Sequence, residues 1–221
     1  MKNSLLIKRL VGVATLTALV VALQFLSNYV AFGPVSITLA LIPIAVGAVL
    51  YGPYIGGFLG LVMGAIALTA PSTAVFLQAN PWATVIVCLG KTGIAGLLSG
   101  FVFQLFAFIA KKQENKKVKM GLFAAGIITA ALIVPPVNTF LFCVGSIIWF
   151  TEVMGTAFVA ILNAVFATNF LIEFLVSTFA APGVIVLVKV LSRNYNLGFV
   201  NDFSNFIDDE DEEVLEEAVA I

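Results

Sequence analysis

Residues 80–112 form an apolar run that is long enough to cross a lipid bilayer and that holds one ionised side chain, Lys91, inside it. A charge at such depth costs from about 3 to more than 10 kcal/mol, so it usually faces a partner, water or a ligand. The tripeptide ending at Thr92 looks like the end of a phosphate-binding loop, but that motif requires a glycine where this chain has Val85. We therefore interpret Lys91 as a functional charge inside a membrane protein.

The composition also indicates an integral membrane protein. Apolar residues make up 61% of the chain and charged residues 10%, and the mean hydropathy is +1.12, whereas about a quarter of the residues in a soluble domain are charged. The two cysteines, Cys88 and Cys143, lie in apolar runs and the chain has no histidine. A disulfide scaffold or a His/Cys metal site is therefore not expected, and we predict no cofactor.

Six apolar segments predict an all-α membrane domain of six transmembrane helices in residues 1–193. The expected spans are residues 7–26, 37–50, 55–68, 82–110, 120–150 and 156–191. The fifth contains Pro135 and Pro136, and we interpret it as one kinked span. Splitting it would place Lys189 and Arg193 outside, against the rule that cytoplasmic loops are basic. The sixth is long enough to tilt, or to bend at Pro182.

The distribution of charge predicts the orientation. Residues 111–119 form a strongly basic loop, which is expected in the cytoplasm. Six spans then place both termini in the cytoplasm, and residues 69–82 and 149–155 outside. Nine of the twelve acidic residues lie in residues 202–217, so residues 194–221 are predicted to form an acidic, disordered cytoplasmic tail.

Two stripes of small residues predict close helix contacts. Gly56, Gly60 and Gly64 recur every four residues in the third span, and Ala14, Ala18 and Ala22 do so in the first. Helix association in lipid depends on packing, which small residues favour. The alanine stripe has two interpretations: it packs inside this chain, or it forms a surface for a partner.

Polar side chains in three spans are expected to meet in one interior. At about 1.5 Å per residue, Lys91 lies about 13 Å from Trp82 and Asn138 about 16 Å from Trp149, so the two are at similar depth. On the sixth span, three polar residues share an arc of about 120°; they are Asn163, Asn169 and Glu173.

These patterns predict a pocket that is open to the outside, with the polar segment 69–82 as a candidate lid. The expected ligand-binding residues are Lys91, Asn138, Asn163, Asn169, Gln78 and Trp82. Three alternatives stay open: a polar network that only joins helices, an intramembrane enzyme that uses Lys91 and Glu173, and a membrane scaffold. Direct pairing of Lys91 with Glu173 is left open, although a depth difference of about 13 Å argues against it.

Four stretches of the chain carry a resemblance to a known family. They are the alanine stripe, LALIPIAVGAVLYGPYIGGFLGLVMG at 39–64, NPWATVIVCLGKTGIAGLLSG at 80–100, and PPVNTFLF and NFLIEFLV at 135–142 and 169–176. Over residues 6–193 the chain resembles the substrate-binding S components of energy-coupling factor (ECF) vitamin transporters. The acidic tail departs from the usual ending of that family, and we assign it no transport role.

The resemblance implies a six-helix subunit of the bacterial plasma membrane that binds a small water-soluble vitamin from outside and is not an enzyme. Transport in that family needs a coupling transmembrane subunit and two cytoplasmic ATPases, and the stripe of Ala14, Ala18 and Ala22 matches the family's coupling surface. No nucleic-acid partner is expected. Lys91 favours a ligand with a carboxylate, such as pantothenate or niacin, over uncharged riboflavin.

Overall fold

The computed structural model describes residues 2–29, 31–32, 35–36 and 38–194. The elements in this part of the chain are α1 (Lys2–Tyr29), β1 (Ala31–Phe32), β2 (Val35–Ser36), α2 (Leu41–Tyr51), α3 (Pro53–Ala67), η1 (Pro71–Thr73), α4 (Ala74–Ala79), α5 (Pro81–Lys111), α6 (Lys116–Met154) and α7 (Thr156–Asn194). The predicted helical fold class is confirmed, with one short antiparallel hairpin, β1–β2, added to it. The predicted acidic tail lies outside the described residues beyond residue 194.

Four of the described helices are long and apolar enough to cross a membrane: α1, α5, α6 and α7. A fifth span results if α3 and the η1–α4 segment, which are bent by 77° relative to each other, form one broken span. The eleven residues of α2 reach only about 16 Å, about half the thickness of the hydrocarbon layer. The six-span topology therefore remains a prediction, with α2 as a short, buried helix in the middle of the bundle.

Local sequence explains where the helices begin and end. Gly52 separates α2 from α3 with φ +95°, a conformation that glycine adopts without strain, and Pro53 occupies the first turn of α3. Asn80 caps α5 by accepting a hydrogen bond from the Ala83 amide at 3.1 Å. Residues 69–82, the candidate lid, contain η1 and α4, because a short helix satisfies the backbone groups of this segment.

The two prolines of α6 do not break it. α6 runs through Pro135 and Pro136 and ends at Met154, so this segment is one helix and not two; the kinked membrane span predicted for it stays a prediction. The external loop predicted at 149–155 is reduced to Gly155, which has φ +83° and joins α6 directly to α7. α7 likewise continues through Pro182.

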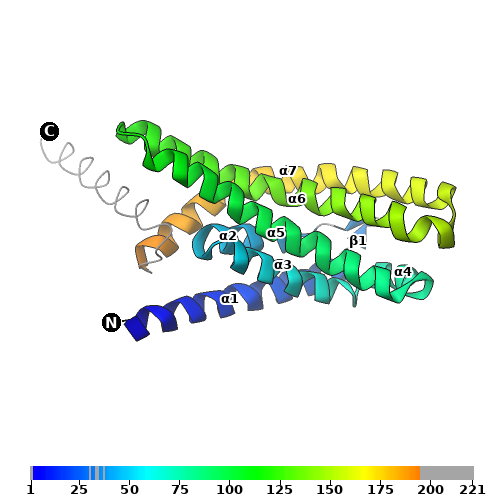
Figure 1. The fold of residues 1–221 in the computed structure, drawn as a ribbon. Helices are drawn as coiled ribbons and strands as arrows, with labels where there is room; N and C mark the ends of the chain where they lie inside the picture. The colour runs from blue at the N-terminus through cyan, green and yellow to red at the C-terminus, as the bar shows by residue number, and fades with distance from the viewer. Residues whose placement is uncertain (1, 30, 33–34, 37, 195–221) are drawn as a thin grey trace, which may run out of the picture.

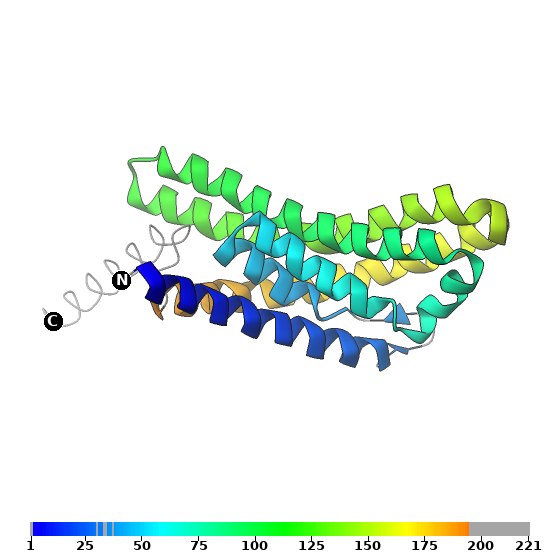
Figure 2. The same ribbon diagram turned by 60° about the horizontal axis from the view of Figure 1, so that its bottom comes forward.

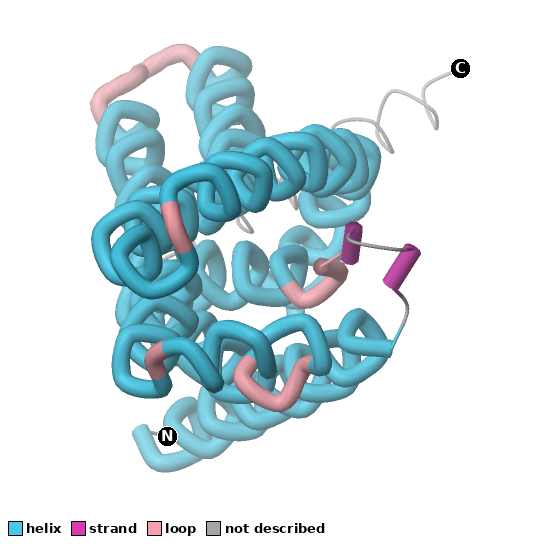
Figure 3. Tube along the Cα trace, turned by 90° about the vertical axis from the view of Figure 1, so that its right-hand side faces the viewer, coloured by secondary structure: helices cyan, strands magenta, loops and turns pink. Residues whose placement is uncertain are grey.

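The connections gather at two opposite ends of the bundle (Figures 1 and 2). The beginning of α1, the end of α7 and the α5–α6 connection lie at one end, and α4 and the α6–α7 turn lie at the other. Which of these ends faces the cytoplasm stays a prediction. Figure 3 looks along the bundle from the α4 end and shows the β1–β2 hairpin at its edge.

α3 and α5 touch backbone to backbone through glycines. A Cβ on Gly60 would lie 2.1 Å from the Thr92 carbonyl oxygen, and a Cβ on Gly96 would lie 2.1 Å from that of Gly56. A side chain at either position would overlap the facing backbone, so only glycine allows this approach. The close contact predicted for the glycine stripe is confirmed, and it fixes α5 against α3 beside Lys91.

The two faces of α1 have different environments. Leu16, Val20 and Gln24 are buried in the bundle, whereas Ala14, Ala18 and Ala22 are exposed. These alanines line a shallow groove on the outside of the molecule together with Phe58 of α3. Among the described residues no other helix covers that face, which favours a partner surface over packing inside the chain; the role of the stripe stays a prediction.

Candidate functional site

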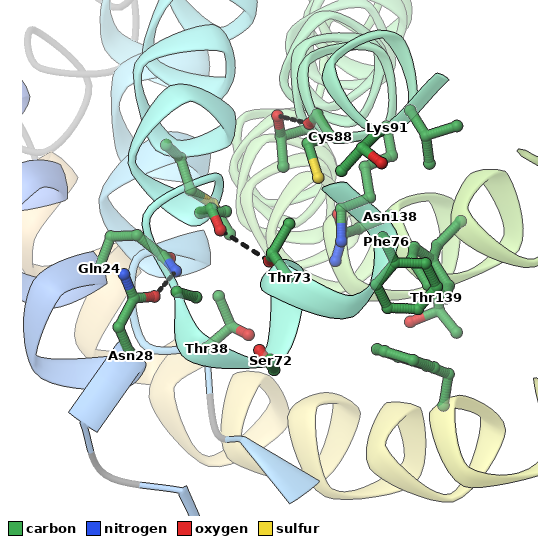
Figure 4. Close-up of a pocket in the computed structure, with 18 of the residues that line it drawn as sticks. Gln24, Asn28, Thr38, Ser72, Thr73, Phe76, Cys88, Lys91, Asn138 and Thr139 are labelled. Atoms are coloured by element: carbon green, nitrogen blue, oxygen red, sulfur yellow. Dashed lines mark hydrogen bonds between the residues drawn. The ribbon is translucent and has the colours of Figure 1, made fainter. Parts of the chain in front are cut away.

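A pocket lies between the helices, nearer the end of the bundle that holds α4 (Figure 4). Its walls come from α1, α3, η1, α4, α5, α6 and α7 and from the segment before α2. The polar and charged lining residues are Gln24, Asn28, Thr38, Ser72, Thr73, Thr84, Lys91, Thr92, Asn138, Thr139 and Glu173. The remaining lining residues are apolar or cysteine. A pocket with apolar walls and a few polar groups is the usual form of a small-molecule site.

Lys91 brings a positive charge to this pocket. Its ammonium lies 4.8 Å from the centre of the Phe142 ring, a cation–π contact between α5 and α6. Among the described residues, no hydrogen bond or ion pair reaches Lys91, and none joins it to Glu173. All three ammonium donors are therefore available to a ligand.

Aromatic rings form the wall around this charge. Phe142 lies 4.1 Å from Phe166 between ring centres, and Phe76 packs edge-on against Phe142 and Phe150 at 5.7 and 5.2 Å. Such rings exclude water, which strengthens electrostatic interactions with the nearby ammonium. The wall links α4, α6 and α7 at the same part of the pocket.

Amide and carboxyl groups lie on the other side of the pocket. Gln24 donates from Nε2 to Asn28 Oδ1 at 2.9 Å, and Asn28 donates to the Ile66 carbonyl at 3.3 Å. Glu173 of α7 is 4% exposed and accepts a short hydrogen bond from the Thr38 hydroxyl. Figure 4 shows Gln24 and Asn28 on the side opposite Lys91 and Asn138, with Thr38, Ser72 and Thr73 between them.

Two of the predicted ligand-binding residues line the pocket together. Lys91 of α5 and Asn138 of α6 are both lining residues, and Figure 4 shows them near each other. Asn138 is 6% exposed, and its Oδ1 has no hydrogen-bond partner among the described residues. Such an orphaned buried acceptor is rare in folded proteins, and a donor from water or from a ligand would satisfy it; a ligand contact by Asn138 stays a prediction.

The other predicted residues lie elsewhere or are not described. Asn163 is not a lining residue, and its Oδ1 accepts a hydrogen bond from Ser146 at 2.6 Å, which joins α7 to α6. Gln78 is exposed on α4, and Trp82 is 79% exposed on α5. The side chain of Asn169 lies outside the described part of the chain. A ligand contact by any of these four stays a prediction.

The predicted lid contributes to the pocket through residues that the sequence did not single out. Ser72, Thr73 and Phe76 are lining residues, and the Thr73 hydroxyl donates to the Ala67 carbonyl at 2.8 Å, which holds η1 against the end of α3. Gln24 was also missed. The available signal was a polar amide inside the first apolar run, the same signal that identified Asn138.

The arrangement suits binding more than chemistry. In the described residues, no group of three or more His, Cys, Asp or Glu side chains is placed to hold a metal ion. The pocket combines the Lys91 ammonium with several oxygen acceptors. It is therefore equipped to hold an anionic small molecule with hydrogen-bond donors.

Comparison with known proteins identifies one distant relative. The chain is 26% identical over 187 residues to the pantothenic acid transporter PanT of Lactococcus lactis subsp. cremoris (strain MG1363), an alignment that covers 77% of this chain and 86% of that protein. No protein-family model matches the chain. The similarity supports a membrane transport role for the fold described above.

Proposed function

We propose that this chain is the binding subunit for uptake of a small water-soluble vitamin that carries a carboxylate. The observation that carries the proposal is the Lys91 ammonium in the pocket wall, which has an aromatic ring beside it and no polar partner among the described residues. An intramembrane charge of this kind is retained where it has a function. A ligand carboxylate provides the missing counter-charge.

Pantothenate is the ligand that we favour. Its carboxylate suits Lys91, and the relative described above is named a pantothenic acid transporter. Niacin carries the same charge on a small aromatic ring, and riboflavin is the uncharged comparison. Catalysis is less well supported, because an enzyme would have to rest on Lys91 and Glu173 alone.

We further propose that transport requires an ECF module, with a coupling transmembrane subunit and two cytoplasmic ATPases. The exposed stripe of Ala14, Ala18 and Ala22 supports this part of the proposal, because small residues on the outside of a membrane helix allow a partner helix to approach closely. In this arrangement the protein lies in the bacterial plasma membrane. Both termini face the cytoplasm, and the α4 end faces outward.

The test is to identify and measure the ligand of the purified protein. The wild-type chain is extracted in detergent, and small molecules released by denaturation are identified by mass spectrometry. Pantothenate, niacin and riboflavin are then titrated into ligand-free protein by calorimetry. We expect pantothenate in the released fraction and a saturable binding isotherm for it. A protein that binds none of the three, and releases no carboxylate-bearing vitamin, would contradict the proposed function.

A further inference from the structure

We infer that Gln24 is a specificity-determining residue of the pocket, and that the ligand is an elongated anion with neutral hydroxyl or N–H donors at the end away from its carboxylate. This inference rests on the proposed function and narrows it to a class of ligand. It assigns the carboxylate to Lys91 and the donors at the far end to Gln24, whereas Asn138, which lies on the Lys91 side, would meet a donor nearer the carboxylate. The sequence patterns described above predict neither a role for Gln24 nor which end of the ligand faces which side of the pocket.

The first argument is the orientation of the Gln24 amide. Asn28 donates its own amide to the Ile66 carbonyl at 3.3 Å, so its Oδ1 remains as the acceptor for Gln24 Nε2 at 2.9 Å. The nitrogen of Gln24 is thereby committed to Asn28. Its Oε1 is the atom left over, and this oxygen is buried with no hydrogen-bond partner among the described residues.

Gln24, the residue that carries this oxygen, lines the pocket. Gln24 is 6% exposed and is a lining residue. An unmade hydrogen bond at a buried acceptor is costly, so the bound state is expected to supply a donor. Asn138 Oδ1 is a second acceptor of the same kind in the same pocket.

The third argument is the charge distribution. Glu173 lines the pocket and contacts Thr38, and Figure 4 places Thr38 toward the Gln24 side and away from Lys91. A ligand carboxylate is attracted by the Lys91 ammonium and disfavoured beside the oxygens of Glu173 and Gln24. These oxygens instead favour hydroxyl and N–H groups.

Gln24 and Lys91 face each other across the pocket. α3 packs against both α1, which carries Gln24, and α5, which carries Lys91, and Figure 4 shows the two side chains on opposite sides of the pocket. One ligand that meets both Gln24 and Lys91 must therefore be elongated. A compact aromatic carboxylate such as niacin does not fit this description, and its ring nitrogen is an acceptor that cannot donate to Gln24 Oε1.

Three probes test the inference. Pantothenate has a carboxylate at one end and two hydroxyls at the other. Panthenol replaces the carboxylate with an alcohol. N-(3,3-dimethylbutanoyl)-β-alanine, here called the dideoxy compound, keeps the carboxylate but lacks both hydroxyls. For the wild-type protein in detergent, we expect the dideoxy compound to bind at least about tenfold more weakly than pantothenate, because the pocket acceptors stay unpaired.

Gln24→Met then assigns the effect to one residue. This variant should weaken pantothenate binding at least about tenfold and change the affinity for the dideoxy compound less than about threefold, so that the preference for hydroxyls is lost. Gln24→Met should weaken the binding of panthenol by about the same factor as the binding of pantothenate. Gln104→Met is the matched control, because Gln104 does not line the pocket, and it should leave all three affinities unchanged.

The outcomes separate the inference from the function on which it rests. Wild-type protein that binds pantothenate and the dideoxy compound equally well overturns the inference and leaves the proposed function standing, and this measurement does not require any variant to fold. Equal weakening of both compounds by Gln24→Met also overturns the role of Gln24. Wild-type protein that binds no pantothenate overturns the proposed function and the inference together.

Discussion

Gly60 of α3 lies so close to Thr92 of α5 that a Cβ on Gly60 would be 2.1 Å from the Thr92 carbonyl oxygen. Lys91 immediately precedes Thr92, so the backbone contact that joins the two helices also fixes the position of the α5 backbone from which the Lys91 side chain extends. The Thr92 hydroxyl donates to the Cys88 carbonyl at 2.9 Å and completes this turn. The position of the pocket charge therefore depends on the absence of a side chain on the facing helix.

Gly60→Ala is expected to destabilise the protein. The added methyl group meets backbone atoms, which move only if the two helices separate, and overpacking of this kind costs about 1–3 kcal/mol. Thermal denaturation of the purified protein in detergent should show a lower midpoint. Pantothenate affinity should fall as well, because separation of α3 from α5 moves Lys91.

Gly90→Ala is the matched control for this change. Gly90 is adjacent to Lys91, but a Cβ there would meet no atom within 4 Å. Alanine also favours the helix by up to about 1 kcal/mol relative to glycine. An equal loss of stability in both variants would show that the Gly60 contact is not the cause.

Lys91→Met is expected to weaken pantothenate binding by about 1.5 kcal/mol or more, the value for a lost charged hydrogen bond. The protein should remain folded, because the substitution removes a charge that is costly in the membrane interior. Calorimetry with pantothenate and panthenol measures the effect. The affinity for panthenol should change little, since panthenol has no carboxylate for the ammonium to bind.

Lys112→Met is the control for Lys91→Met. Lys112 also has its ammonium over an aromatic ring, 4.4 Å from the centre of Phe108, but it lies at the end of α5 and does not line the pocket. Its replacement should leave pantothenate affinity unchanged. If Lys91→Met binds pantothenate as the wild-type protein does, Lys91 serves the structure and not the ligand.

The membrane orientation is expected to place the two ends of the bundle on opposite sides. In a protein without native cysteines, Asn115→Cys should be protected from a membrane-impermeant reagent in intact cells, whereas Gln78→Cys and Glu152→Cys should react. Position 115 lies in the α5–α6 connection, and the other two lie at the α4 end. External labelling at position 115, or protection at 78 and 152, would contradict the orientation proposed from the basic loop.

The sequence predicted the parts of the fold that depend on composition and spacing within one helix. The apolar runs indicated α1, α5, α6 and α7, and the glycine stripe indicated the contact that Gly60 makes. Lys91 and Asn138 were identified because a charge or an amide is unusual in an apolar run, and their positions along neighbouring spans predicted a common depth.

The remaining features depend on how one helix is rotated against another. The spacing of Asn163 places it on the same face of its helix as Glu173, but the register between α7 and α6 brings it to Ser146 and away from the pocket. Gln24 becomes informative only when Asn28 is seen to fix its amide nitrogen. Such contacts between helices have no signature in the residues of either helix alone.

Ala18→Trp is expected to separate ligand binding from transport. Ala18 is exposed in the middle of the stripe and lines the groove on the outside of α1. A large side chain there lies in the open groove on the outside of the bundle, beside Phe58 of α3, so the isolated protein should fold and bind pantothenate normally. Uptake by cells that contain the ATPase module should fall to background, because the indole holds the coupling subunit away from the groove.

Leu19→Trp is the matched control for the coupling surface. Leu19 is the next residue of α1 and is 44% exposed, but it does not line the groove. The same bulk placed one residue away should therefore leave uptake unchanged. Vitamin uptake and the amount of each variant in the membrane are measured in the same cells, so that loss of transport is not mistaken for loss of protein. Wild-type uptake by Ala18→Trp protein that reaches the membrane would end the assignment of Ala14, Ala18 and Ala22 to a coupling surface.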